Sequence, residues 1–164
     1  MVEPKAARPY MPGYGLLPEN EGSGLLPWGW AEKRLVTSRN YWVATVWPDG
    51  RPHAMPVWGM WGEGAFWFSS SNRSRKTRNL MANPRCVVTT EDADAPVVVE
   101  GVAALVTDPK TLARVLAWEN AKYETDYSID MLDPALNACF RVTPTWAFGI
   151  EQGDFTGSPT RWEF

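Results

Sequence analysis

Histidine and cysteine are scarce in this 164-residue chain, and their scarcity excludes several kinds of active site. His53 is the only histidine, so the chain has too few histidines for a catalytic triad with a second histidine beside it and for a histidine-based metal cluster. We interpret His53 as an ordinary strand residue rather than a catalytic acid. Cys86 and Cys139 lie far apart and outside any CxxC pair, so we expect two buried free thiols and no bound metal.

Long apolar runs and a strong net charge are also missing. No uninterrupted apolar segment approaches the roughly 18 residues of a membrane span, and the first five residues lack the apolar region of a signal peptide. With free thiols as well, the sequence predicts a cytoplasmic protein with no membrane partner. The net charge of −3 provides no general attraction to nucleic acid, so we expect no nucleic-acid partner. Any anion site must therefore come from a local cluster of cations.

Proline and glycine set the first part of the chain apart from the rest. Residues 1–27 contain five prolines and four glycines, which forbid regular structure over most of that length. The sequence predicts a Pro/Gly-rich arm over 1–27 and a single domain over 28–164. Composition favours a disordered tail for the arm, and the alternative is a strap bound to a neighbouring surface through its tyrosines and leucines.

Hairpin signals dominate the single domain. Short aromatic and β-branched runs alternate with turns such as Pro48-Asp49-Gly50, and no regular alternation of strands with helices appears. The pattern predicts a mainly β protein, a closed antiparallel barrel of six strands with flanking helices. The expected strands are 41–47, 53–61, 65–70, 85–90, 96–106 and 138–151, and the expected helices are 28–38, 74–83 and 109–123.

Three residues within the expected strands predict local irregularities. Pro56 cannot donate a ladder hydrogen bond, so its part of the strand must be an edge, a bulge or a break that leaves backbone groups free for a ligand. Gly101 predicts a bend in the strand 96–106, and Pro144 predicts an interruption of the strand 138–151.

One segment carries an electrostatic conflict. Where the strand 65–70 runs into the helix 74–83, Arg73, Arg75, Lys76 and Arg78 gather around the helix start with no carboxylate among them. Helix N-termini already attract anions, because their first N–H groups are unpaired and the macrodipole is positive there. A bound phosphate would resolve this conflict. The alternative is a solvated basic face, and the residues alone leave the two interpretations open.

Four stretches taken together resemble a known family. They are the hairpin YWVATVWPDGRPHAMPVWGMW, the strand and helix AFWFSSSNRSRKTRNLMANPR, the strand VVVEGVAALV and the ending TPTWAFGIEQGDFTGSPTRWEF. They resemble the pyridoxamine 5′-phosphate oxidase-like flavin-binding split barrels, including their deazaflavin-dependent branch, from about residue 30 to residue 164. The resemblance implies a six-stranded antiparallel split β-barrel.

The resemblance also implies a cofactor site with three parts. The cofactor ring lies along the second strand, its ribityl chain near the end of the third, and its phosphate on a Ser-x-Lys motif. The implied cofactor-binding residues are Pro56, Val57 and Trp58 for the ring, Ser69 and Ser70 for the ribityl chain, and Ser74, Arg75 and Lys76 for the phosphate.

The family further implies a homodimer with the cofactor site at the interface, where a late strand of the partner completes each pocket. Trp146 and Phe148 are the candidates for that role, and their alternative is barrel core. The quantity of aromatic residues predicts the same assembly, because ten tryptophans, six phenylalanines and five tyrosines exceed what a small barrel can hide. We therefore expect an obligate homodimer.

The implied function is that of an FMN- or deazaflavin-dependent oxidoreductase, a flavoprotein that transfers hydride between its cofactor and a small conjugated or aromatic substrate. The cofactor is coenzyme F-420 or FMN, and the extra Arg73 and Arg78 favour the polyglutamate tail of F-420. No catalytic residue is assigned. An Arg-x-His pair for pyridoxamine phosphate has no equivalent, so that substrate is not expected. Two rivals stay open: a non-catalytic flavin or haem carrier of the same fold, and a single-strand nucleic-acid module.

Overall fold

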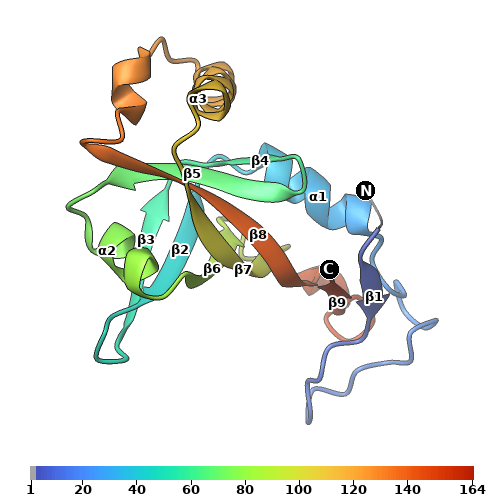
Figure 1. Ribbon diagram of the computed structural model, residues 1–164. Helices are drawn as coiled ribbons and strands as arrows, with labels where there is room; N and C mark the ends of the chain where they lie inside the picture. The colour runs from blue at the N-terminus through green and yellow to red at the C-terminus, as the bar shows by residue number, and fades with distance from the viewer. Residues whose placement is uncertain (1–2) are drawn as a thin grey trace.

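The computed structural model describes residues 3–164, in which nine antiparallel strands form one sheet that curls into a barrel (Figure 1). Six of these strands have six or more residues, and the other three are shorter. The long strands are β2 (Tyr41–Val46), β3 (Pro52–Val57), β5 (Ala65–Ser71), β6 (Arg85–Thr90), β7 (Val97–Val106) and β8 (Asn137–Gly149). The short strands are β1 (Lys5–Ala7), β4 (Met60–Gly62) and β9 (Thr160–Glu163).

Three α-helices flank the barrel at α1 (Trp28–Thr37), α2 (Arg75–Ala82) and α3 (Pro109–Tyr123). All three expected helices are confirmed to within a residue or two. Local caps explain two of the starts: the Thr111 N–H donates to the Asp108 carboxylate at 2.8 Å, and Ser74 caps α2. In Figure 1, α2 lies beside β2 and β3 at one side of the barrel, whereas α3 stands beyond β5. Two short 3-10 helices, Ile129–Leu132 and Gln152–Asp154, complete the elements.

The sheet has the strand order β1-β9-β8-β7-β6-β2-β3, with β5 paired to the first half of β8 and β4 paired to β5. The strand β3 is thus an edge, which confirms the expectation from Pro56. The register shifts between Glu100 and Gly101, which confirms a bend there. A Cβ on Gly101 would lie 2.6 Å from the Thr143 carbonyl oxygen, so only glycine fits at this crossing.

Two expected strand boundaries are wrong. The segment 53–61 is broken between β3 and β4, because Gly59 is pressed against Phe66, whose ring would lie 2.2 Å from an added Cβ. Conversely, β8 runs through Pro144 without interruption. Pro144 lies opposite Gly101, beside the irregularity in the ladder, where its missing N–H is tolerated.

The core fills the barrel and continues under α3. In the main cluster the largest fully buried side chains come from five elements and are Leu35, Tyr41, Phe66, Phe68, Phe140 and Trp162. A second cluster lies between β4, β5 and α3, around Met60, Trp67 and Val115. The two cysteines are buried free thiols, as expected. Within the described residues, no helix is long and apolar enough to cross a membrane.

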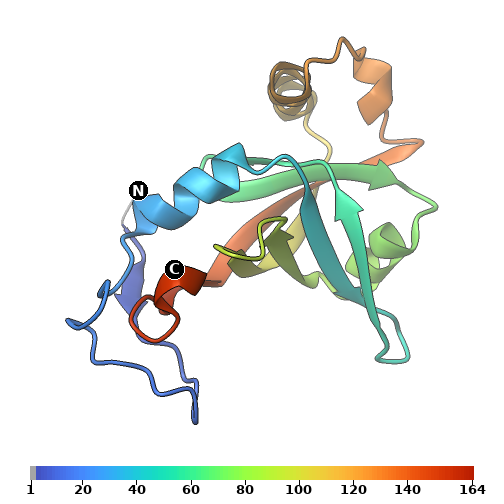
Figure 2. The same ribbon diagram turned by 180° about the vertical axis from the view of Figure 1, so that it is seen from behind.

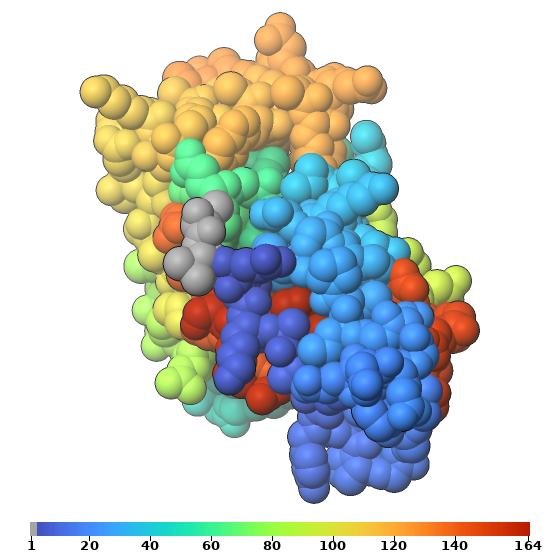
Figure 3. Space-filling view, turned by 90° about the vertical axis from the view of Figure 1, so that its right-hand side faces the viewer, coloured from blue at the N-terminus to red at the C-terminus, as the bar shows by residue number. Residues whose placement is uncertain are grey.

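The N-terminal arm is packed against the domain, so a disordered tail is the wrong interpretation. Its strand β1 pairs with β9, and the Arg8 guanidinium donates to the carbonyls of Pro159 at 2.8 Å and Pro18 at 2.9 Å. Composition could not reveal the pairing of β1 with β9 or the bond to Pro159, because both join segments at opposite ends of the chain. Figure 3 shows the arm lying over the C-terminal segment, and Figure 2 shows its loop projecting beyond the sheet.

Candidate functional site

The start of α2 brings two of the predicted residues into contact. The strand β5 ends at Ser71, and Ser74 then caps the helix by accepting the Thr77 N–H at 3.2 Å. The Ser70 hydroxyl lies 2.9 Å from the Ser74 hydroxyl and donates to it. Ser69 pairs with Cys139 of β8 and is half-buried. The two hydroxyl groups of Ser70 and Ser74 therefore form a short chain that ends at the first turn of α2.

Lys76 lies in this first turn and is half-buried. Burial lowers the pKa of Lys76 below its ordinary value. No ion pair in the described part of the chain involves Lys76, and no acidic residue lies in the first turn of α2. A desolvated ammonium without an anion is an unfavourable arrangement unless a ligand supplies the charge.

Arg75 is held by the hairpin that joins β2 to β3. Its guanidinium lies 3.7 Å from the centre of the Trp47 ring, and Arg51 lies 4.4 Å from the same ring. The hydrogen bonds from Arg51, together with the more distant charge of Arg75, lower the pKa of Asp49. Stacking occupies the face of the Arg75 guanidinium and leaves its N–H edge available for an anion.

The edge strand β3 carries the three residues predicted to face the cofactor ring. Pro56 is exposed, and Trp58, just past the strand, is 39% exposed. Val57 instead packs against the main core cluster and is half-buried. Helix α2 packs against β2, β3 and β5, so the ring, ribityl and phosphate residues lie on elements that meet around α2.

The last turn of α3 forms a further cluster that the sequence did not indicate. The Gly59 N–H donates to the Tyr123 hydroxyl at 2.8 Å, and the Lys122 ammonium donates to the Gly59 carbonyl at 2.9 Å. Lys122 also donates to the Tyr41 hydroxyl at 2.6 Å. The Trp58 and Tyr123 rings stack at 4.3 Å between centroids and 3° between planes. These partners lie more than sixty residues apart, so no local motif could have predicted the cluster.

Burial dominates the electrostatics of this cluster. It lowers the pKa of Lys122 to about 8, with Arg39 adding to the shift and Glu91 opposing it. It also raises the pKa of Tyr41 and the pKa of Tyr123. The two phenols therefore stay protonated and serve as hydrogen-bonding groups at neutral pH.

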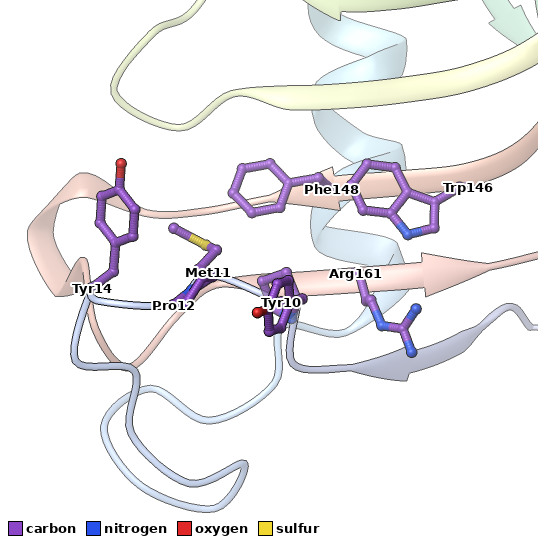
Figure 4. Close-up of a pocket in the computed structure, with 8 residues that line it drawn as sticks. Tyr10, Met11, Pro12, Tyr14, Trp146, Phe148 and Arg161 are labelled. Carbon is purple, nitrogen blue, oxygen red and sulfur yellow. The ribbon is translucent and has the colours of Figure 1, made fainter.

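Trp146 and Phe148 lie in a different place from the residues around α2. Their rings are nearly parallel, 6.4 Å apart on the second half of β8, and both are half-buried. Figure 4 shows them with Tyr10 and Arg161 around a hollow of about 630 Å³ between β8, β9 and the arm. Ser69 and Ser70 pair with the opposite half of β8, so one chain by itself does not bring Trp146 to Ser74.

No metal-binding cluster appears in residues 3–164: nowhere there do three or more His, Cys, Asp and Glu side chains gather to hold an ion. His53 lies in β3 against Trp47, with ring centroids 6.3 Å apart, and its Nδ1 is buried without a partner. The histidine is thus part of the hairpin whose Trp47 stacks on Arg75.

The antiparallel sheet and its three flanking helices define a split barrel. A family model described as pyridoxamine 5′-phosphate oxidase matches residues 31–150. The chain therefore belongs to the pyridoxamine 5′-phosphate oxidase family, as the sequence motifs indicated. No curated protein sequence matches the chain.

Solved structures agree with this assignment. A conserved hypothetical protein, Rv2991 from Mycobacterium tuberculosis, is 25% identical with a TM-score of 0.69, over 77% of this chain and 86% of that one. A structure described as an F420 reductase is 29% identical with a TM-score of 0.59, over 71% of this chain and 94% of that one. The haem storage protein HutZ from Vibrio cholerae, at 20% identity and a TM-score of 0.58 over 70% and 87%, shares the fold.

Proposed function

We propose that this protein binds a phosphorylated flavin or deazaflavin, FMN or coenzyme F-420, and works as an oxidoreductase on a small conjugated or aromatic substrate. The observation that carries the proposal is Lys76, a half-buried ammonium at a helix start with no anion among the described residues. A bound phosphate would accept from the Lys76 ammonium and from the first free N–H groups of α2.

The residues present fit the rest of such a cofactor. Ser70 is positioned beside Ser74 to face a polyol chain, and the open edge of β3 offers backbone groups and the exposed Trp58 to a flat ring. When bound, the cofactor supplies the redox chemistry. The chain then binds the phosphate, orients the ring and excludes water, and no side chain is required as an acid or a base.

A homodimer is part of the proposal, and the outward face of the sheet supports it. On that face one row of register neighbours crosses the sheet from β3 to β9, and its members are Pro56, Trp42, Thr89, Val98, Phe148 and Arg161. Trp42 is 49% exposed, and a hollow of about 490 Å³ lies on the same face between β2, β6 and β7. Such an apolar face is typical of an interface.

Two-fold symmetry would join the two ends of this row. Phe148 lies four strands from Pro56, roughly 19 Å at the usual strand spacing, and a single chain cannot close that distance. In an isologous interface the β8 end of one copy meets the β3 edge of the other, and the reverse. Trp146 and Phe148 of the partner would then cover the ring beside Pro56 and Trp58.

Coenzyme F-420 is the cofactor we favour. Arg73 and Arg78 are exposed and take part in no ion pair of residues 3–164, so both are available to a polyanionic tail. The likeness to an F420 reductase at 29% identity supports the same choice. A reducing cytoplasm is the compartment we propose, because Cys86 and Cys139 are free thiols.

The first experiment titrates dialysed protein with FMN and with F-420 and follows fluorescence quenching, visible absorption and the oligomeric state by light scattering. We expect saturable binding of one or both, and a dimer that loses its cofactor as dilution dissociates it. A protein that binds neither compound contradicts the proposal. A stable monomer that binds at full affinity contradicts the shared site while leaving cofactor binding in place.

Turnover is tested separately, by mixing the reduced cofactor with candidate acceptors. Binding without oxidation of the cofactor by any conjugated acceptor would favour the second candidate, a non-catalytic carrier. The fold shared with a haem storage protein motivates that candidate, so haem is titrated in parallel and followed through its Soret band. Haem binding that excludes FMN and F-420 would replace the first proposal with the second.

A further inference from the structure

We propose that the last turn of α3 positions Trp58, and that the outer face of this indole is the surface on which the cofactor ring stacks. Lys122 and Tyr123 act through Trp58 and Gly59 and are positioning residues. The inference rests on the proposed function, which it deepens by naming the side chains that orient the ring.

The end of α3 holds the backbone of Gly59 in place through hydrogen bonds. Both polar groups of its backbone are bonded to consecutive residues of α3, the N–H to Tyr123 and the carbonyl to Lys122. The Tyr123 hydroxyl also donates to the Arg39 carbonyl at 2.7 Å. Gly59 is buried, and Tyr123 is only 3% exposed. Buried bonds of this kind are costly to break, so the corner between β3 and β4 has one strongly favoured conformation.

The position of Trp58 follows from the hydrogen bonds that hold Gly59. It directly precedes Gly59, and one face of its indole is covered by the stacked Tyr123 ring. The side chain is nevertheless 39% exposed, so part of the indole that Tyr123 does not cover is accessible. Trp58 follows Pro56 by two residues at the free edge of the sheet. A flat ring lying along that edge would meet an indole already held in orientation, which lowers the entropic cost of stacking.

Lys122 connects the hydrogen bonds at Gly59 to the barrel strand β2. Its ammonium donates to Tyr41, whose hydroxyl donates in turn to the Leu35 carbonyl at 2.6 Å. The same ammonium lies 4.7 Å from the centre of the Tyr41 ring. The charged groups that act on Lys122 are Glu91 and Arg39, and Glu91 is itself bonded to the Arg39 and Asn40 backbone. Lys122 is thus satisfied inside the chain and is not available to a ligand.

Hydrogen bonds that only stabilise the fold would look the same as hydrogen bonds that position Trp58. The test must therefore separate an effect on folding stability from an effect on the orientation of Trp58. Tyr123→Phe keeps the stacked ring and removes both hydroxyl bonds to Gly59 and Arg39. Its matched control is Tyr127→Phe, since Tyr127 is 42% exposed and uses only backbone atoms in its hydrogen bonds. Trp58→Ala removes the stacking surface itself, and the double variant Trp58→Ala with Tyr123→Phe tests whether Tyr123 acts through Trp58.

The first measurement needs no cofactor. In amide correlation NMR spectra of the apo protein, the Trp58 indole signal is assigned from its loss in Trp58→Phe. We expect Tyr123→Phe to shift this signal and Tyr127→Phe to leave it unchanged. An unchanged Trp58 signal in Tyr123→Phe would overturn the positioning role, whatever cofactor the protein binds.

The second measurement is affinity for FMN and F-420, with inorganic phosphate as a ringless probe. We expect Tyr123→Phe to weaken ring binding about three- to tenfold and to leave phosphate binding unchanged. In the Trp58→Ala background the same substitution should have no further effect. Additive losses, or full affinity in Trp58→Ala, would overturn this inference alone. Failure of the wild-type protein to bind either cofactor would overturn the proposed function and the ring surface together.

Discussion

The start of α2 and the end of α3 each hold a half-buried lysine whose pKa is lowered by burial. The two differ in what surrounds the ammonium. The Lys122 ammonium donates to a phenol and to a carbonyl of its own chain, whereas the Lys76 ammonium has neither an ion pair nor a hydrogen bond within residues 3–164. Partners built into the chain stabilise one conformation of the α3 end. The missing partner at α2 is what a ligand can supply.

The cations next to each lysine sharpen the contrast. At α2, Arg73 and Arg78 are exposed, and Arg75 presents an N–H edge while its face is stacked on Trp47. At α3, Arg39 stands near Tyr123 and Glu91 is bonded to the Asn40 side chain. Excess positive charge therefore remains at α2 and is compensated at α3.

The largest expected effect comes from removing the unsatisfied ammonium. Lys76→Met should weaken FMN or F-420 binding about tenfold to a hundredfold, since a charged hydrogen bond to phosphate contributes about 1.5–3 kcal/mol. Fluorescence titration measures it, with Lys33→Met on the exposed side of α1 as the matched control. An unchanged dissociation constant for Lys76→Met would remove Lys76 from the phosphate site.

A smaller effect is expected from the two free arginines. If Arg73 and Arg78 bind the tail of F-420, the double change to glutamine should weaken F-420 binding by up to about thirtyfold and leave FMN binding nearly unchanged, since exposed pairs contribute up to about 1 kcal/mol each. Raising the salt concentration should reduce the difference between the affinities of the wild-type protein for F-420 and for FMN. Equal affinities at low salt would favour FMN as the natural cofactor.

Trp47 offers a finer test of how Arg75 is held. Trp47→Leu removes the stacking surface, and we expect cofactor affinity to fall about two- to fivefold because an exposed cation–π contact contributes roughly 0.5–1 kcal/mol. The matched control at the other region is Trp118→Leu, which removes the contact of Arg114 with Trp118 on α3. Equal losses in the two variants would mean that the effect is general instability.

The smallest effect is a pH dependence of stability at the α3 end. An unfolded lysine has its ordinary pKa of 10.5, and Lys122 in the fold has a pKa of about 8. Between these values the unfolded chain binds more protons, so the contribution of Lys122 to stability rises with pH, and its full burial cost is present only below about 8. The raised pKa of Tyr41 acts with the opposite sign once unfolded tyrosine ionises near pH 10.

Denaturant titrations of the wild-type protein and of Lys122→Met between about pH 7.5 and 9.5 isolate this contribution as the difference between the two curves, because Cys86, Cys139 and Lys76, whose pKa values burial also shifts, titrate alike in both. The free energy of unfolding should rise less with pH in Lys122→Met than in the wild-type protein, whereas Lys110→Met, where the lysine is exposed at the start of the same helix, should follow the wild type. A rise that is unchanged in Lys122→Met would mean that Lys122 keeps an ordinary pKa. The comparison between Lys122, which has partners in the chain, and Lys76, which has none in residues 3–164, would then no longer hold for Lys122.

Most elements of this fold could be predicted because their signals are local. Asp108 with Pro109 marks a helix start, and Ser74 marks another, since each cap acts within one turn. Pro56 predicted an edge, a bulge or a break, because its missing N–H is likewise a local property. The strand β9 and the break at Gly59 were missed, because β9 pairs with β1 across the whole chain and the break depends on Phe66 and Tyr123.

The amino-acid sequence by itself determined the long strands and the three α-helices, the family and a basic helix start that conflicts with its own dipole, because periodicity, caps and charge clusters are properties of short segments. Only the tertiary structure decided that Lys76 lacks a partner while Lys122 has two, that Trp58 stacks on Tyr123, and that the arm is packed through Arg8. Each of these depends on contacts between residues far apart in the chain. Such contacts leave no periodic trace, and burial, which lowers the pKa of both lysines, exists only once the chain has folded.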